Sequence, residues 1–278
     1  MQGEYKKMKE TKKSIYAKHG IDYKNGKILS PMGWINEILK KGNSKTGKDV
    51  YTFSTLPTNK IFKTKYGNVK GTCPLKCNGC YATLGCYNFP SVINSLALNT
   101  ILVRKYLQFV ENAILSQLET LKKIDELRIF ASGDFYISDD KEVNDEYVEM
   151  WKRIIKQNPH KFTWTYTKVK EYENAFDDLP NANIVKSVIN GIGFNFGKVE
   201  YILSTYKKLK AMGKDVYICK CGFDKNQHCH GCHSCSKHDF VLFLEHSTGY
   251  EPTESPLYET LKAIVMAQEN ENESVKIA

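Results

Sequence analysis

The chain has 278 residues and a formal net charge of +9, and it is 41% hydrophobic, 26% charged and 12% aromatic. This composition is that of a globular protein, long enough for one large domain or two ordinary ones. No apolar run approaches the length of a membrane span, and no apolar stretch follows the basic N-terminus. We therefore expect no membrane segment, no secretory signal and a cytoplasmic location. In that reducing environment, the nine cysteines favour metal binding or redox chemistry over disulfides.

The positive charge indicates an anionic partner, and nucleic acid is the first candidate. The lysines are spread along the chain with only short clusters, such as 207–210, so a solvated lysine-rich surface explains them equally well. The aromatic residues Phe162, Trp164 and Tyr166 could stack on bases. Their alternation within a predicted strand favours a place in the core instead.

Three regions follow one another along the chain. Residues 1–65 are expected to form an irregular N-terminal extension with short strands, one of them near 50–54. Residues 66–265 are expected to form an α/β domain, with a Cys-rich insert at 219–238 before its last strand. Residues 266–278 are acidic and polar, and we expect this tail to fray.

Predicted strands and helices alternate through the α/β domain. The strands are expected at 65–73, 126–131, 161–167, 183–189, 215–221 and 239–246. The helices are expected at 90–123, 142–157, 170–176, 198–213 and 255–267. This order predicts βαβ units with a parallel sheet, which could curl into a partial barrel or lie flat as a doubly wound sheet.

Three cysteines crowd the segment "GTCPLKCNGCYA", where Cys73, Cys77 and Cys80 follow the first predicted strand in a C-x3-C-x2-C spacing. Thiolates are soft ligands that suit iron–sulfur clusters or zinc. Three thiolates on a four-iron cluster leave one iron open to a substrate or cofactor. A structural zinc site with Cys86 as fourth ligand is the alternative, although we expect Cys86 to be a small core residue at the start of the next helix.

The C-x3-C-x2-C loop after the first strand resembles the cluster loop of the radical S-adenosylmethionine (SAM) superfamily. The resemblance implies an α/β fold of the partial (β/α)6 TIM-like barrel type and a [4Fe-4S] cluster on Cys73, Cys77 and Cys80. It implies that the open iron chelates SAM, which is cleaved reductively to methionine and a 5′-deoxyadenosyl radical. It also implies an electron donor such as flavodoxin or ferredoxin. The family usually has an aromatic residue before the third cysteine. Here Gly79 stands there, and Tyr81 follows and could pack against the cluster.

The resemblance also implies SAM-binding residues after the second and fourth strands. The Gly-rich element that binds the SAM amine is matched by Ser132, Gly133 and Asp134. Gly133 permits a close backbone approach, and Asp134 supplies an acceptor for an ammonium group. Taken alone, this segment would be an ordinary turn. The residue that contacts the ribose is matched by Ser187 or Asn190, each of which could equally be a satisfied polar group at a strand end.

The insert at 219–238 predicts a second metal site on Cys221, Cys229, Cys232 and Cys235. The C-x2-C-x2-C run resembles the ferredoxin pattern for an auxiliary four-iron cluster, whereas the nearby histidines keep zinc open. We leave Cys219 out of this set because it lies deeper in a predicted strand, where a buried free cysteine is common.

Residues 42–245 are also similar to a phage-encoded family called gene product 88-like, through the polar lead-in, a cysteine cluster that ends in Cys-Tyr-Ala and a second Cys-rich motif. The sequence has no P-loop, nucleophile elbow or HExxH motif, which disfavours nucleotide hydrolysis and serine or zinc hydrolase chemistry. Two functions stay open: a radical SAM enzyme, with tRNA or DNA as the first candidate substrate and a peptide or small molecule as the alternative, and a non-catalytic, zinc-stabilised nucleic-acid-binding protein.

Overall fold

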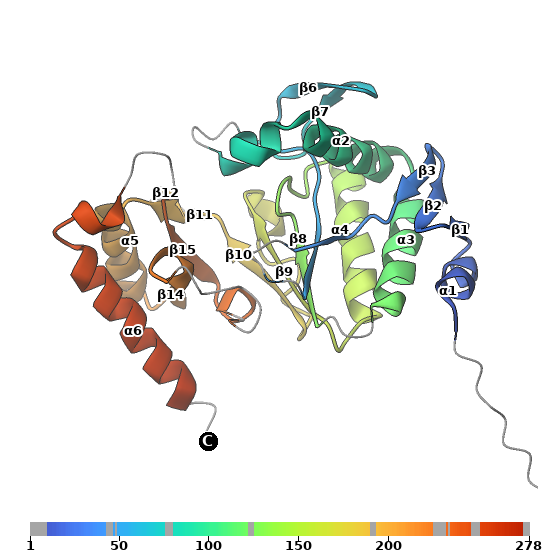
Figure 1. The fold of residues 1–278 in the computed structure, drawn as a ribbon. Coiled ribbons are helices and arrows are strands. Elements are labelled where there is room, and N and C mark those ends of the chain that lie inside the picture. Colours follow the sequence, from blue (N-terminus) through green and yellow to red (C-terminus); the bar gives the residue numbers. More distant parts are fainter. Residues whose placement is uncertain are drawn as a thin grey trace, which may run out of the picture.

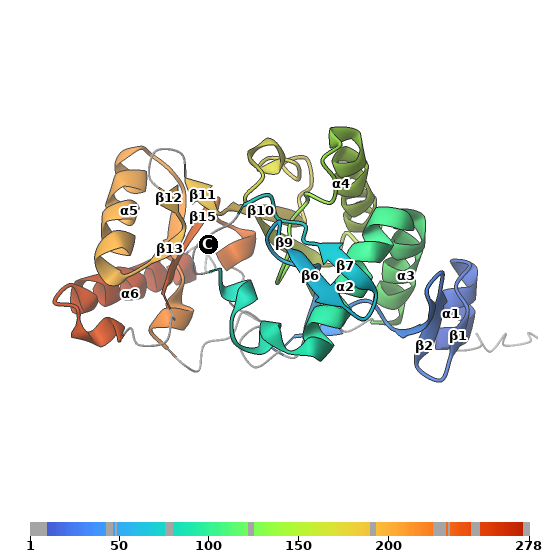
Figure 2. The ribbon, with the colours of Figure 1, turned by 90° about the horizontal axis from the view of Figure 1, so that it is seen from above.

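The protein is described by a computed structural model that covers residues 10–42, 47, 49–75, 80–121, 125–189, 193–224, 232, 234–245 and 251–274. The fold mixes helices with several small sheets (Figures 1 and 2). The helices are α1 Lys12–Lys18, α2 Pro90–Lys105, α3 Leu107–Thr120, α4 Lys141–Lys156, α5 Val199–Ala211 and α6 Tyr258–Ser274. Short 3-10 helices are η1 Tyr81–Thr83, η2 Gly85–Asn88, η3 Lys170–Tyr172, η4 Lys220–Gly222, η5 Ser234–Ser236 and η6 Pro252–Glu254.

A three-stranded antiparallel sheet of β1 Tyr23–Lys24, β2 Lys27–Ser30 and β3 Gly33–Asn36 lies beside α1. Its strands alternate in burial, so that Ile28 faces inward and is fully buried. Figures 1 and 2 place this sheet at the end of the molecule opposite α5 and α6. The N-terminal region is therefore a packed part of the fold rather than an irregular extension.

The main sheet has the strand order β10-β9-β8-β5-β4. Its strands are β4 Lys40–Lys41, β5 Val50–Phe53, β8 Glu126–Ile129, β9 Phe162–Thr167 and β10 Ala182–Lys186. The neighbours β5, β8, β9 and β10 run parallel, as the alternation of strands and helices predicts. Because the carboxyl ends of parallel strands meet at one edge, the loops after these strands lie close together.

One apolar core lies between this sheet and the helices α3 and α4, which run side by side in Figure 1. Asp140 caps the start of helix α4, because its carboxylate accepts a hydrogen bond from the backbone of Glu142. Its buried residues recur at helical spacing and place Tyr147 and Trp151 at the centre of the core. A second core joins α5 and α6 to the small parallel sheet of β13 Phe196–Gly197, β14 Val216–Ile218 and β15 Phe240–Leu244.

The predicted first strand is not part of the parallel sheet. Within 65–73, β7 Gly67–Lys70 pairs with β6 Ile61–Thr64 in an antiparallel hairpin. The strand that precedes the cysteine loop in the main sheet is β5, which belongs to the region predicted as an extension. The partial six-stranded barrel stays a prediction, because the five-stranded main sheet and the sheet of β13, β14 and β15 are separate. A hydrogen bond from Lys186 N to Asp239 O (3.1 Å) links the end of β10 to the residue before β15.

Two helix predictions also need correction. The single helix predicted at 90–123 is broken at Tyr106 (φ −142°, ψ 49°), which lets residues of both α2 and α3 enter the same core. The tail expected to fray from 266 onward is helical as far as Ser274. Gln268 anchors it, because its Oε1 accepts a hydrogen bond from Ile218 N (3.1 Å) at β14. In the part of the chain described, no helix has the length and apolarity needed to cross a membrane.

Gln117 joins the N-terminal region to α3. Its amide receives a hydrogen bond from Leu39 N (2.8 Å) and donates one to Leu39 O (2.9 Å), and all these groups are buried. We expect Gln117→Ala to lower the free energy of unfolding by about 2–4 kcal/mol, since two buried backbone groups lose their bonds.

Urea denaturation measures this loss. Gln108→Ala on the same helix is the matched control, because the side chain of Gln108 is exposed and, among the described residues, bonds only to Asn112. Equal losses in the two variants would contradict the assigned role of Gln117.

Candidate active site

The chain returns Cys73 to the carboxyl end of β5. After β5, it passes Leu56, forms the β6–β7 hairpin and comes back, where Thr72 N donates to Leu56 O (2.9 Å) and Cys73 N donates to Thr58 O (3.2 Å). Cys73 is 8% exposed. The first cysteine therefore lies at the carboxyl end of a parallel strand, where reactive groups of parallel α/β folds gather, but that strand is β5 and not the strand predicted at 65–73.

The segment Ser132–Asp134 after β8 contacts this same place. Thr55 N donates to Ser132 O (3.0 Å), and the Ser132 hydroxyl donates to Thr55 O (2.9 Å). Gly133 has φ +94°, and a Cβ atom there would lie 1.9 Å from Thr55 Oγ1 and 2.8 Å from Thr72 Oγ1. Only glycine fits between these two threonines. The residue before Cys73 and the turn after β8 are thus in direct contact.

Asp134 ties the ends of β8 and β9 together. Its backbone N–H donates to Thr72 Oγ1 (3.1 Å). Its carboxylate accepts bonds from Phe135 N (2.8 Å), Thr167 Oγ1 (2.7 Å) and Lys168 N (2.9 Å). Burial raises the pKa of Asp134, and the donors from Lys168 and Thr167 act in the opposite direction. The carboxylate is 2% exposed, so most of its hydrogen-bonding capacity serves the fold.

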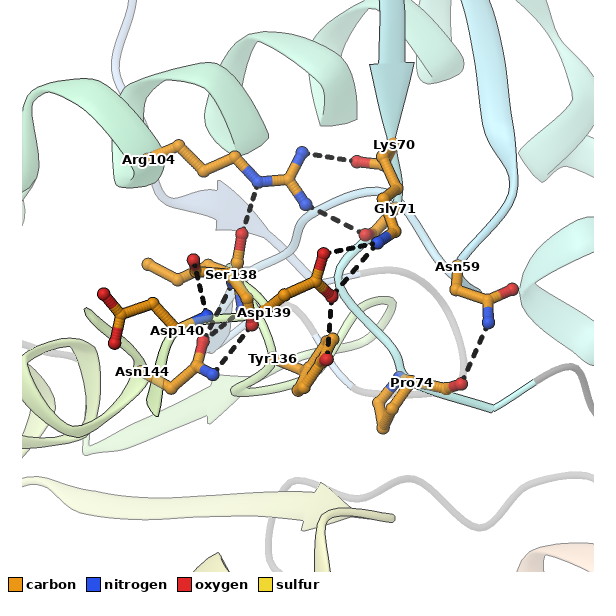
Figure 3. Close-up of polar contacts among 11 residues, drawn as sticks. Asn59, Lys70, Gly71, Pro74, Arg104, Tyr136, Ser138, Asp139, Asp140 and Asn144 are labelled. Carbon is orange, nitrogen blue, oxygen red and sulfur yellow. Dashed lines mark hydrogen bonds and ion pairs between the residues drawn. The ribbon is translucent and has the colours of Figure 1, made fainter. Parts of the chain in front are cut away.

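Arg104 holds the backbone just before Cys73 (Figure 3). Its guanidinium donates to Lys70 O (2.6 Å), Gly71 O (2.9 Å) and Ile137 O (2.6 Å). On the other side of Cys73, the amide of Asn59 donates to Pro74 O (3.1 Å). The backbone is therefore clamped on both sides of the first cysteine.

An ion pair closes this network at the surface. Lys70 Nζ lies 3.2 Å from the carboxylate of Asp139, which also accepts a bond from the Tyr136 hydroxyl (2.8 Å). These two donors hold the pKa of Asp139 below its usual range. Nearby, Asn144 accepts from Ile137 N and Ser138 N and donates to Ser138 O, which fixes the loop that leads into α4.

The other cysteines of the first loop are only partly described. Cys80 is half-buried, and its carbonyl accepts bonds from the backbone and hydroxyl of Thr83. Cys77 lies outside the described residues, as does the side chain of Tyr81, whose backbone begins η1. Cys86 is an exposed free thiol on η2. The core position predicted for Cys86 is wrong, because η2 precedes α2 as a separate surface turn.

Ser187 joins the same strand-end network. It is buried, and its backbone N–H donates to Thr167 O (3.1 Å), while the Thr167 hydroxyl donates to Asp134. The structure therefore brings Ser187 within one residue of the Asp134 carboxylate. Asn190 lies outside the described residues.

Within the second cysteine group, Cys235 on η5 lies against the sheet at β9 and β10. The Tyr166 hydroxyl donates to Cys235 Sγ (3.0 Å), and the Asn183 amide donates to the carbonyls of Cys235 (2.8 Å) and His238 (3.0 Å). Cys232 Sγ is 3.3 Å from Ser234 Oγ, and Cys221 is half-buried in η4.

Cys219 is half-buried and packs with Cys235 on the cluster of Val185, Tyr217 and Val241. Burial raises the pKa of Tyr217 to about 12, and Cys232 and Cys219 contribute to the rise. Within the described residues, no three His, Cys, Asp or Glu side chains are grouped to hold a metal ion. Cys77 and Cys229, one from each predicted ligand set, lie outside those residues, so both sets stay predictions.

A cavity of about 580 Å³ lies elsewhere, where β13 and β15 end. Its lining residues are Gly193, Phe196, Gly197, Lys198, Glu200, Tyr201 and Glu245. None of the described residues predicted for the site lines it, so we base the candidate site on the contacts around Cys73.

Four residues that connect the site, three threonines and an arginine, were not predicted from the sequence. Thr55, Thr72 and Thr167 carry the buried hydroxyl network, and Thr55 Oγ1 lies 2.7 Å from Thr72 Oγ1. Thr72 had a signal in its position next to Cys73. Arg104 had none, because it lies inside a helix and acts on backbone carbonyls that are distant in sequence.

The close approach at Gly133 can be tested against a matched glycine. Gly67 has φ +91° and nothing within 4 Å of its Cβ position. We expect Gly67→Ala to lose about 1–3 kcal/mol from backbone strain alone. Gly133→Ala should lose about 1–3 kcal/mol more, because its methyl group overlaps Thr55. Urea denaturation compares the two variants, and equal losses would refute the packing described here.

Comparison with known proteins adds one finding. No curated protein and no solved structure matches the chain. A family model, Gene product 88, matches residues 37–249, which is well over half of the chain. This confirms the phage-related resemblance seen over 42–245, and the match contains both cysteine groups. The chain therefore belongs to the Gene product 88 family.

Proposed function

We propose that this protein is a cytoplasmic radical SAM enzyme that reductively cleaves SAM and modifies a nucleic acid. One observation carries the proposal: Thr72, next to Cys73, packs against Gly133 and accepts a hydrogen bond from Asp134 N. Two motifs that the resemblance expects to act together are 60 positions apart in the sequence yet in contact in the fold. The parallel strands β5, β8, β9 and β10 follow one another in order, and the helices α3 and α4 share one core; both features support a barrel-like arrangement.

The donor set fits a four-iron cluster. Cys73 and Cys80 supply two thiol groups, and Cys77 would supply the third. When bound, the cluster would supply the single electron that cleaves SAM. An electron donor such as flavodoxin or ferredoxin would then return an electron to the cluster. Arg104 and Asn59 hold the backbone around Cys73, so this thiol needs little reorganisation to bind iron.

The turn after β8 would bind the methionine end of SAM. A carboxylate offers about four acceptor positions, and three described donors occupy Asp134. One position is left for an ammonium group. Because Asp134 is buried, we assign it mainly a positioning role, in which it fixes Gly133 and Ser132 beside the cysteine loop. Ser187 follows β10 and bonds to Thr167, and from there it would bind the ribose of SAM.

A second metal, zinc or an auxiliary cluster, would bind Cys221, Cys229, Cys232 and Cys235. The bond from the Tyr166 hydroxyl to Cys235 Sγ supports this role, since donors to a ligating sulfur stabilise its thiolate form. The net charge of +9 supports tRNA or DNA as the substrate.

The cluster can be tested with single cysteine variants. Anaerobically purified protein should contain iron and sulfide, absorb in the visible region and bleach with dithionite. It should form 5′-deoxyadenosine from SAM. Cys73→Ser, Cys77→Ser and Cys80→Ser should each abolish this product, because each removes one cluster ligand.

Cys86→Ser is the matched control and should keep the product, since Cys86 is exposed on η2. A colourless protein with two zinc ions per chain, one of them lost in Cys86→Ser, would contradict the proposal. It would favour the zinc-stabilised nucleic-acid-binding protein instead.

The second site has its own test. We expect Cys235→Ser to lose one metal centre per chain in elemental analysis, whereas Cys219→Ser should retain it. Retention of all metal in Cys235→Ser would remove Cys235 from the ligand set, and loss in Cys219→Ser would add Cys219.

A further inference from the structure

The outward face of the β1–β3 sheet combines exposed apolar side chains with lysines. In the strand register, Lys24 lies opposite Lys27, and Leu29 lies opposite Trp34. Trp34 is 48% exposed and Leu29 is 39% exposed. Neighbouring strands place directly paired residues on the same side of a sheet, so Trp34, Leu29 and both lysines share one surface.

The hairpin forces these side chains outward. Asn25 and Gly26 both have positive φ, 51° and 77°, which is the geometry of a two-residue turn in a β-hairpin. Strand alternation then turns Ile28 into the core and Tyr23 onto Tyr16, where the two rings stack at 4.8 Å. Lys24, Lys27 and Leu29 are left on the opposite, solvent side.

The positive charges of Lys24 and Lys27 favour binding of an anion on this face. Lysines directly opposite each other on a sheet repel, and within the described part of the chain neither Lys24 nor Lys27 lies in an ion pair. Asp22 is exposed next to this edge, and it is outnumbered by the two lysines. Glu37, at the end of β3, is already bonded to Lys12 (3.1 Å) and to the Tyr16 hydroxyl (2.7 Å).

We propose that this face, defined by Lys24, Lys27, Leu29 and Trp34, binds single-stranded nucleic acid. An unpaired base stacks on the Trp34 ring beside Leu29, and a phosphate lies between the two lysines. Duplex bases are stacked inside the helix and do not offer such a plane. Of the three tryptophans, Trp151 and Trp164 are buried at 0% and 3% exposure, so Trp34 is the one whose ring is open to a base. The inference rests on the nucleic-acid part of the proposed function and is independent of SAM cleavage.

The exposed tryptophan provides its own probe. The full chain is titrated with fluorescein-labelled oligo-dT and oligo-U of about 12 nucleotides, a length within the range of single-strand sites. We expect saturable binding by anisotropy, quenching of the tryptophan emission and protection of Trp34 from acrylamide. Trp34→Ala should weaken binding roughly 5- to 150-fold. Met212→Ala is the control, because Met212 is equally apolar, is 59% exposed and follows α5 at the other end of the molecule.

The lysines are tested by salt dependence. Lys24→Gln and Lys27→Gln should each reduce the slope of log K against log salt by up to about 0.7, the value for one phosphate of a single strand. Unaltered binding in Trp34→Ala, preference for a duplex of the same length, or concentration-dependent self-association that buries Trp34 would each overturn the proposal. Failure to cleave SAM leaves these measurements unaffected, whereas SAM cleavage without oligonucleotide binding would refute this inference alone.

Discussion

The contact of Thr72 with Gly133 determines where the first cysteine lies. A hairpin separates β5 from Cys73 in the sequence, and the bonds from Thr72 to Leu56 and from Cys73 to Thr58 bring the cysteine back to the sheet edge. Gly133 allows this return because any side chain there would occupy the space of Thr55 and Thr72. The hydroxyl groups of these two threonines bond to each other, and that of Thr72 also accepts a bond from the buried backbone N–H of Asp134.

The end of β9 contacts both candidate sites. Thr167 donates to Asp134 in the turn beside Cys73, whereas its neighbour Tyr166 donates to Cys235 in the second cysteine group. Adjacent residues of a strand point to opposite faces of the sheet, so one strand positions two separate groups. The guanidinium of Arg128 lies over the Tyr166 ring at 5.2 Å, so Tyr166 contacts both Arg128 and Cys235.

Local patterns predicted most elements well. The alternation of Phe162, Trp164 and Tyr166 correctly predicted strand β9. Gly213, which has φ +68°, correctly indicated the end of α5. The break at Tyr106 was not predictable, since no Gly or Pro stands there, and its result is seen only in the fold, where residues of both helices lie in one core. Cys86 was misplaced for a similar reason: a helix start was recognised, but the separate turn of η2 before it was not.

Residue types and their spacing were enough to identify the two cysteine groups, the glycine of the turn after β8, the parallel βαβ order and membership of the Gene product 88 family. These features depend on residue type and short-range spacing, which a single chain displays directly. The folded structure was needed to show that the cysteine loop lies at the end of β5, that Arg104 bonds to the backbone before Cys73, and that Trp34 is the exposed tryptophan. These features depend on which distant segments pair as strands or share a buried surface, and the local spacing of residues does not specify that pairing.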